Sequence, residues 1–225
     1  GRMSGGRYSG IAPGGNLIMV KVLDRKGNGY SSDVLAGISW VLERKEQLGI
    51  RILNISVGAC SKRGMSENSA LVKGVNRAWD AGLVVVVAAG NNGPRTMSIT
   101  TPGISRKVIT VGCSDDDREV LVGGNRMVDY SGRGPTAACI CKPDLVAPGC
   151  SVVSCSSRAD KYTIKSGTSM STPIVSGAVA LLLERFPDMS NKDVKLRLRE
   201  SSVDIGLPRN QQGWGLLDVG KMLER

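Results

Sequence analysis

The sequence predicts an α/β fold, a three-layer α/β/α arrangement in which a mostly parallel central sheet lies between helices. Apolar runs rich in β-branched residues alternate with amphipathic helical patterns, and the connections between them are short. This alternation is typical of a parallel sheet with both faces covered. A chain of 225 residues is long enough for a full-sized core, and we expect one domain over residues 1–225.

Four apolar runs are predicted to form buried strands, because each is short and rich in branched side chains. They cover residues 16–23, 50–58, 83–91 and 107–112. In parallel sheets, functional groups gather in the loops at the carboxyl ends of the strands. The segments "SVG", "AAGN" and, ahead of a later apolar helix, "GTSMS" are therefore the expected positions of a site.

Amphipathic helices are predicted between these strands. Residues 32–49 place Val34, Leu35, Ile38, Val41 and Leu42 on one face. We expect Ser31 or Ser32 to cap this helix and the glycine at its end to terminate it. Residues 66–82 repeat the same apolar spacing and also end in glycine.

The later part of the chain is predicted to be less regular at first and then helical. Residues 115–134 indicate surface strands and turns. A helix over residues 190–200 begins with Ser190 and Asp193 in a capping-box arrangement. The segment "GWGLLDVGKMLER" predicts a short closing helix.

Composition argues against two classes of partner. The formal net charge is +10, but basic and acidic residues are mixed along the chain, and one Phe and four Tyr offer little surface for base stacking. We therefore expect no nucleic-acid partner. No apolar run approaches the length of a membrane span, and we expect no membrane insertion.

Six cysteines are present, four of them in "CICKPDLVAPGCSVVSC" with the spacing C-x-C-x8-C-x4-C. This spacing lacks the paired C-x2-C knuckles of common zinc modules. We expect free thiols or small buried residues here, and no metal site. The cysteines leave the redox compartment of the protein open.

The stretch "KSGTSMSTPIVSGAVALLLERF" places Ser169 at the start of a helix that is apolar nearly all round. Free backbone N–H groups and the positive dipole end favour negative charge at such a position. The Ser169 N–H and the Asn91 amide are thus candidate donors to a developing oxyanion. Taken singly, each motif also fits a structural role, in which Ser169 caps a helix and Asn91 makes a turn.

Several motifs in sequence order resemble the subtilisin-like serine proteases, and the resemblance covers essentially the whole chain. "SGTSMSTP" resembles the nucleophile motif of that family, "VVVVAAGNNG" its oxyanion-asparagine strand and "LNISVG" its substrate-binding strand. "YSGIAPGGNLIMVKVLDRKGNG", "SGRGPT", "KPDLVAPG" and "GWGLLDVGKML" are similar to further segments of the family.

The resemblance implies a serine endopeptidase that acts on polypeptides through an acyl-enzyme on Ser169, with Asn91 as oxyanion donor. It implies backbone pairing with an extended substrate by Ser56, Val57 and Gly58. It further implies a pocket that is bordered by Ala88, Ala89, Gly90 and Thr100, with a cis peptide bond between Thr101 and Pro102.

The chain departs from the family in one decisive respect, because it contains no histidine. The triad of the family runs in the order Asp, His, Ser, and we expect the aspartate strand and the histidine helix upstream of Gly1. Without a base the Ser169 hydroxyl is not activated, so these residues alone are expected to be nearly inactive. Lys165 would need burial to serve as a base. Ser171 and Ile174 replace alanine and histidine of the usual motif.

The missing first strand would leave a sheet edge uncovered, and the resemblance therefore also implies self-association of this chain. No cofactor is required for the expected chemistry. Structural calcium is common in the family, but the opening loop offers no acidic ligand, and a solvated turn explains the acidic run at 114–117 equally well. The family default for location is extracellular.

Two other functions compete with the peptidase. A pseudoprotease would keep the fold and bind peptides without cleaving them. Retention of both oxyanion donors argues against it. An unrelated α/β hydrolase that acts on esters would carry its serine in a G-x-S-x-G elbow, and "GTSMS" lacks the second glycine.

Overall fold

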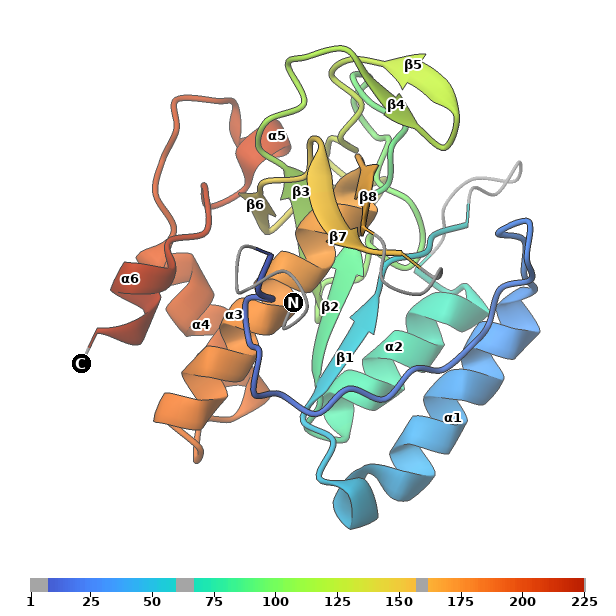
Figure 1. The fold of residues 1–225 in the computed structure, drawn as a ribbon, viewed down its shortest axis with the longest axis vertical. Coiled ribbons are helices and arrows are strands. Elements are labelled where there is room, and N and C mark those ends of the chain that lie inside the picture. Colours follow the sequence, from blue (N-terminus) through green and yellow to red (C-terminus); the bar gives the residue numbers. More distant parts are fainter. Residues whose placement is uncertain (1–7, 60–66, 157–161, 225) are drawn as a thin grey trace.

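A computed structural model of the chain describes residues 8–59, 67–156 and 162–224. At its centre lies a parallel sheet, seen in Figure 1 with helices on both sides. The strand order is β1 (Ile52–Ile55), β2 (Val84–Ala88), β3 (Ile109–Cys113) and β6 (Leu145–Ala147). Ile55 is paired with Val87, so β1 and β2 end side by side. The predicted fold class is confirmed.

Helices cover both faces of the sheet (Figure 1). On one side α1 (Ser31–Leu48) packs on α2 (Ala70–Asp80), and α2 packs on β2. On the other side α3 (Thr168–Arg185) contacts all four strands, with α4 (Asn191–Ser201) and α6 (Val219–Leu223) beside it. The short α5 (Arg209–Gln212) lies beyond β6. The predicted helices are thus present.

The core lies between these layers and is made of aliphatic side chains. Every residue of β2 and β3 is buried, as expected for central parallel strands. Val175, Val179 and Leu182 of α3 are fully buried against them. This packing holds the first turn of α3 rigidly at the carboxyl ends of β1 and β2.

Two small hairpins lie outside the central sheet. β4 (Val120–Val122) pairs with β5 (Asn125–Met127), which confirms the surface strands predicted in residues 115–134. β7 (Val152–Cys155) pairs with β8 (Tyr162–Lys165), and the chain runs from β8 directly into α3.

The strand predicted over residues 16–23 is wrong. The segment makes no strand, and most of its side chains are exposed, with Leu17 at 82% and Met19 at 81%, whereas Val22 and Leu23 are half-buried. Ile11 contacts α3 at Gly177, and Val20 and Val22 contact α1 at Gly37. An apolar sequence becomes a strand only where a neighbouring backbone completes its hydrogen bonds, and no such partner lies beside it among the described residues.

The predicted cap of the first long helix is also wrong. The helix begins at Ser31 with Tyr30 as its N-cap residue, and neither Ser31 nor Ser32 caps it. The Tyr30 N–H instead donates to the Asp33 carboxylate at 3.4 Å. The predicted capping box of Ser190 and Asp193 is confirmed, with Ser190 accepting from the Asp193 N–H.

Within the described residues, no helix combines the length and apolar character needed to cross a membrane.

Candidate active site

Ser169 lies in the first turn of α3 and is half-buried. Gly167 precedes the helix with φ +135°, a conformation that L side chains rarely adopt. A Cβ at Gly167 would lie 3.3 Å from the Asn91 amide nitrogen, so glycine also permits a close approach of two segments 76 residues apart in sequence, as the numbering shows. The local sequence thereby sets Ser169 beside the carboxyl end of β2.

The Ser169 hydroxyl donates a hydrogen bond to the Ser56 carbonyl oxygen at 2.7 Å. Ser56 directly follows β1, so the bond joins the nucleophile segment to the predicted substrate-binding segment. A peptide carbonyl accepts this hydrogen bond but cannot act as a general base. The bond therefore orients the hydroxyl without activating it.

Asn91 is tied to the start of α3 through Thr168. Its Oδ1 accepts from the Thr168 N–H at 2.9 Å and from the Thr168 hydroxyl at 3.1 Å. These bonds occupy the carbonyl side of the amide and turn its Nδ2 toward Gly167. The Ser169 N–H lies in the first helical turn, where it has no intrahelical acceptor. Two donors, Asn91 Nδ2 and the Ser169 N–H, therefore lie at the start of α3.

Thr168 is a residue of the candidate site that the sequence analysis missed. Its hydroxyl also accepts from the Gly90 N–H at 3.1 Å, so one buried side chain fixes the end of β2 and the Asn91 amide together. The sequence held one signal, a hydroxyl residue directly before the serine. Its partners, 77 and 78 positions away, became visible only in the folded chain.

The predicted pocket residues lie together at the ends of β1 and β2. Thr100 is buried between the two segments: a Cβ at Gly58 or at Gly90 would lie 2.5 Å and 2.4 Å, respectively, from its side chain. The Thr100 N–H donates to the Ala89 carbonyl at 2.8 Å. The wall residues Ala88 and Ala89 are buried.

The strand segment opposite this wall is more open. Val57 is half-buried and Gly58 is exposed, as an edge that pairs with a ligand requires. Ala59, the next residue, forms an antiparallel bridge with Thr101. The Thr101–Pro102 peptide bond is cis, as predicted.

Two further side chains near Ser169 in sequence are Lys165, the candidate substitute base, and Ser171, which replaces the alanine of the usual motif. Lys165 is exposed at the end of β8, so it lacks the burial that a lysine base would need. Ser171 is fully buried, and its Oγ has no hydrogen-bond partner in the described part of the chain.

The acidic run at 114–117 is largely used within the protein rather than being a solvated turn. Asp115 accepts the N–H groups of Gly149 and Cys150, at 2.7 and 3.1 Å. Asp116 is 3% exposed and accepts the Ser131 N–H at 2.7 Å. Burial raises the pKa of the Asp116 carboxyl group. These contacts give no support to a calcium site.

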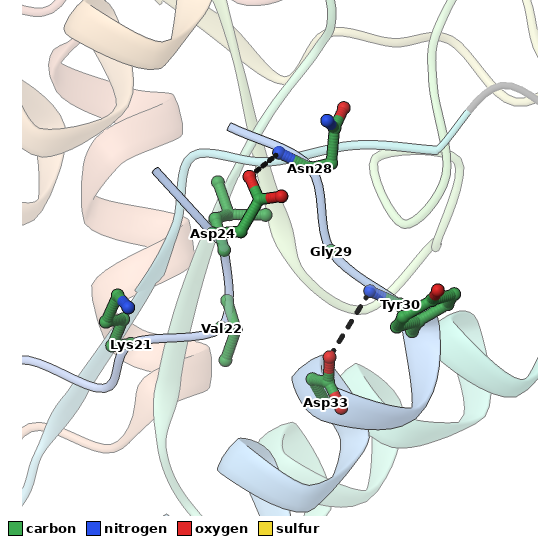
Figure 2. Close-up of a pocket in the computed structure, with 8 residues that line it drawn as sticks. Lys21, Val22, Asp24, Asn28, Gly29, Tyr30 and Asp33 are labelled. Atoms are coloured by element: carbon green, nitrogen blue, oxygen red, sulfur yellow. Dashed lines mark hydrogen bonds between the residues drawn. The ribbon is translucent and has the colours of Figure 1, made fainter. Parts of the chain in front are cut away.

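A hollow of about 410 Å³ lies at the start of α1 (Figure 2). Asp24 accepts the N–H groups of Lys26 and Asn28, at 2.8 and 2.9 Å, and Asp33 accepts that of Tyr30. Both carboxylates thus stabilise local turns. None of the predicted site residues borders this hollow.

Comparison with known proteins agrees with this geometry. Residues 1–215 match the Subtilase family (peptidase S8). The chain belongs to the subtilase family. The motif resemblance described above is thereby confirmed, whereas the roles of the individual site residues stay predictions.

Two relatives and two solved structures define the extent of the similarity. Serine protease AprX of Bacillus subtilis (strain 168) is 39% identical over 219 residues, which is 90% of this chain and 50% of AprX. Subtilisin DY of Bacillus licheniformis is 34% identical over 212 residues, 93% of this chain and 69% of that protein. Two solved structures share the fold. Sphericase has a TM-score of 0.76 and 31% sequence identity, and the match covers 92% of this chain and 69% of that one. S41 Psychrophilic Protease has a TM-score of 0.73 and 29% sequence identity, and the match covers 92% of this chain and 70% of that one. The chain thus spans half the length of AprX.

Proposed function

We propose that this chain supplies the nucleophile, the oxyanion donors and the peptide-binding strand of a serine endopeptidase. The observation that carries the proposal is the arrangement around Thr168, which fixes Asn91 and Gly90 beside Ser169. Membership of the subtilase family and the similarity to serine protease AprX support it.

In the proposed reaction, an extended peptide pairs with the backbone of Ser56, Val57 and Gly58. The Ser169 Oγ leaves its bond to the Ser56 carbonyl and attacks the scissile carbonyl carbon. The resulting oxyanion accepts from the Ser169 N–H and from Asn91 Nδ2. The C–N bond breaks, the amine leaves with a proton, and water then hydrolyses the ester on Ser169.

Each of these transfers needs a group that takes and returns the hydroxyl proton. The 225 residues contain no histidine, and the hydroxyl of Ser169 bonds a carbonyl oxygen. We therefore propose that the chain by itself has little turnover. The chemistry proposed needs no cofactor, and structural calcium is not part of it.

Rescue with imidazole tests the proposal. We expect the chain alone to hydrolyse a p-nitrophenyl ester of an N-blocked peptide at close to the background rate. Added imidazole should raise the rate, because a small base can take the proton that Ser169 must lose. Mass spectrometry of the quenched reaction should find the acyl group on Ser169.

Three variants complete the experiment. Ser169→Ala should abolish rescue and labelling, whereas Ser9→Ala, at an exposed serine, should change neither. Asn91→Ala should lower the rescued rate by about 10²–10³-fold, the size of effect found in subtilisin when one oxyanion donor is removed. Turnover without imidazole at the level of an ordinary protease would show that a base is present. Equal rescue in Ser169→Ala would refute the nucleophile, and peptide binding with no acylation would favour a pseudoprotease.

We also propose that the isolated chain self-associates through its β1 side. Residues 16–23 expose Leu17 and Met19 there, and β1 has no second ladder partner in the described part of the chain. Unpaired edges and exposed apolar side chains favour association. Sedimentation should show mass increasing with concentration, and a Leu17→Lys, Met19→Lys double variant should shift the chain toward monomer. Concentration-independent monomers would contradict the proposal.

A further inference from the structure

A cluster of thiol and carboxylate groups lies behind the start of α3. Cys113 ends β3, Cys150 follows β6, and Asp115 lies between them in space. One ligand atom from each of these residues lies within 4.8 Å of the other two. The Cys113 Sγ is 3.1 Å from the Asp115 Oδ1. Three groups able to hold a metal ion therefore converge from two loops and a strand.

Two further oxygen atoms border the same place. The hydroxyl of Tyr130, a fully buried residue, is 3.2 Å from the Cys113 Sγ and 3.4 Å from the Cys150 Sγ. Ser171 is fully buried, and its Oγ has no partner among the residues described. A Cβ at Gly149 would lie 2.3 Å from this Oγ and 2.8 Å from the Cys113 Sγ. The unpartnered hydroxyl thus faces the cluster, which is where a bound ion or its water would satisfy it.

The carboxylate of Asp115 is held in place by the backbone. Its Oδ1 accepts the N–H groups of Gly149 and Cys150. No hydrogen bond involves Oδ2 in the described part of the chain, so this oxygen remains available to a cation. Hydrogen bonds that orient a ligating carboxylate are typical of metal sites.

We propose that Cys113, Asp115 and Cys150 bind a thiophilic divalent cation of the zinc type. Two sulfurs and an oxygen suit Zn²⁺, which takes four such ligands in a tetrahedron. The Tyr130 hydroxyl or a water that reaches half-buried Cys150 supplies the fourth. Each thiol loses its proton to solvent as its bond to the metal forms, so two protons are released for each ion bound.

A disulfide between the two cysteines needs an external oxidant. Metal binding needs none, because the cation displaces the thiol protons as it binds. The spacing of the cysteines did not predict this site, because Cys113 lies 37 positions before Cys150 and outside the run of four.

The location gives the ion a structural consequence. The Gly149 carbonyl accepts the N–H of Gly167, the N-cap residue of α3, at 3.0 Å. It also accepts the Tyr130 hydroxyl at 3.3 Å. A metal on Cys150 and Cys113 therefore links β3 and the loop after β6 to the turn that presents Ser169. Binding should stabilise the folded chain by mass action.

Metal binding alone tests this site without any assay of peptidase activity. The reduced, metal-free chain is titrated with Co²⁺ and then with Zn²⁺. We expect one Co²⁺ per chain with sulfur-to-cobalt charge-transfer absorbance, displacement by Zn²⁺, and a Zn²⁺-dependent rise in Tm. Zn²⁺ should also protect Cys150 from alkylation by N-ethylmaleimide. Peptide mass spectrometry of the parent chain, without substitutions, locates the alkylated cysteines.

Variants separate this cluster from the other thiols. Cys150→Ser should weaken Zn²⁺ binding by at least about tenfold and remove part of the charge-transfer absorbance. Cys139→Ser, at an exposed cysteine outside the cluster, should leave both unchanged. The proposal is overturned if Co²⁺ binds without charge-transfer bands, if Cys150→Ser binds like the parent, if Zn²⁺ does not protect Cys150, or if a Cys113–Cys150 disulfide forms instead. These readouts do not depend on the proposed peptidase function.

Discussion

The two edges of the parallel sheet differ in whether a further segment of the chain pairs with them. At the β6 edge, Val146 donates to the Gly215 carbonyl and accepts from Leu217, both at 2.9 Å, so a later segment completes its hydrogen bonds. At the β1 edge no described segment forms a ladder, and residues 17–20 leave their apolar side chains exposed. One edge is closed by the fold, and the other is left open.

A buried ion pair marks the closed side. Lys142 is 1% exposed and donates to the Asp144 carboxylate at 2.5 Å and to the Val108 carbonyl at 3.0 Å. The same carboxylate accepts the Thr110 N–H at 2.7 Å, and Lys195 lies 3.5 Å from it. Polar groups are tolerated in this interior because each has a partner.

The comparison teaches that an apolar run does not become a strand by composition alone. Residues 16–23 and β2 are both rich in branched aliphatic side chains. Of these two segments, only β2 has a paired strand on each side, and only β2 is fully buried. Pairing and burial, rather than intrinsic preference, decide the outcome.

The largest effect is expected from breaking the ion pair of the closed edge. Lys142→Met leaves the Asp144 carboxylate buried without its nearest cation, and the free energy of unfolding should fall by about 3–5 kcal/mol. Lys107→Met removes an exposed pair with Asp80 and should cost about 1 kcal/mol or less. Urea unfolding measures the free energy of unfolding of both variants. Equal losses would contradict the expected difference between the buried and the exposed ion pair.

The same pair predicts a pH dependence. Burial lowers the pKa of Lys142 from 10.5 to about 8, although Asp144 opposes the shift. Between these values the unfolded chain binds a proton that the folded chain lacks, so the contribution of Lys142 to stability rises with pH across this window. The stability of the parent relative to Lys142→Met should therefore increase from about pH 8 to about pH 10. A difference independent of pH would contradict the lowered pKa.

A smaller loss is expected where the closing segment turns. Gly215 has φ +128°, and a Cβ there would lie 2.2 Å from the Val203 carbonyl oxygen. Gly215→Ala should cost about 2–3 kcal/mol through strain and displacement of the segment that pairs with Val146. Gly206 has φ +78°, but a Cβ there would meet no atom within 4 Å. Gly206→Ala should therefore lower the free energy of unfolding by about 1 kcal/mol. Thermal unfolding compares the two variants. Equal losses of unfolding free energy would show that the close contact with Val203 does not destabilise Gly215→Ala.

The smallest effect belongs to the open edge. Leu17→Ala should change the free energy of unfolding by about 0.5 kcal/mol or less, because the side chain is already in water. Leu145→Ala, in the fully buried β6, should cost about 2–5 kcal/mol. Denaturant titrations of the two variants compare the edges directly. A large loss from Leu17→Ala would show that residues 16–23 are packed in solution.

Much of the fold was predictable from local pattern. The apolar periodicity of α1 and α2, the capping box of α4 and the valine run of β2 each depend on neighbours in sequence, so their types and approximate bounds followed from the residues. The prediction for residues 16–23 failed because a strand depends on a partner that sequence does not display.

The candidate site likewise has a part that was predictable from local sequence and a part that was not. Ser169 at a helix start and Asn91 at the end of an apolar run could be located from the sequence, because motif and helix terminus are local properties. The contacts by which Thr168 joins Asn91 to Gly90, and by which Cys113 meets Cys150 beside Tyr130, arise only on folding. Those contacts join residues far apart in the chain, and their geometry exists only once the sheet and α3 have packed together.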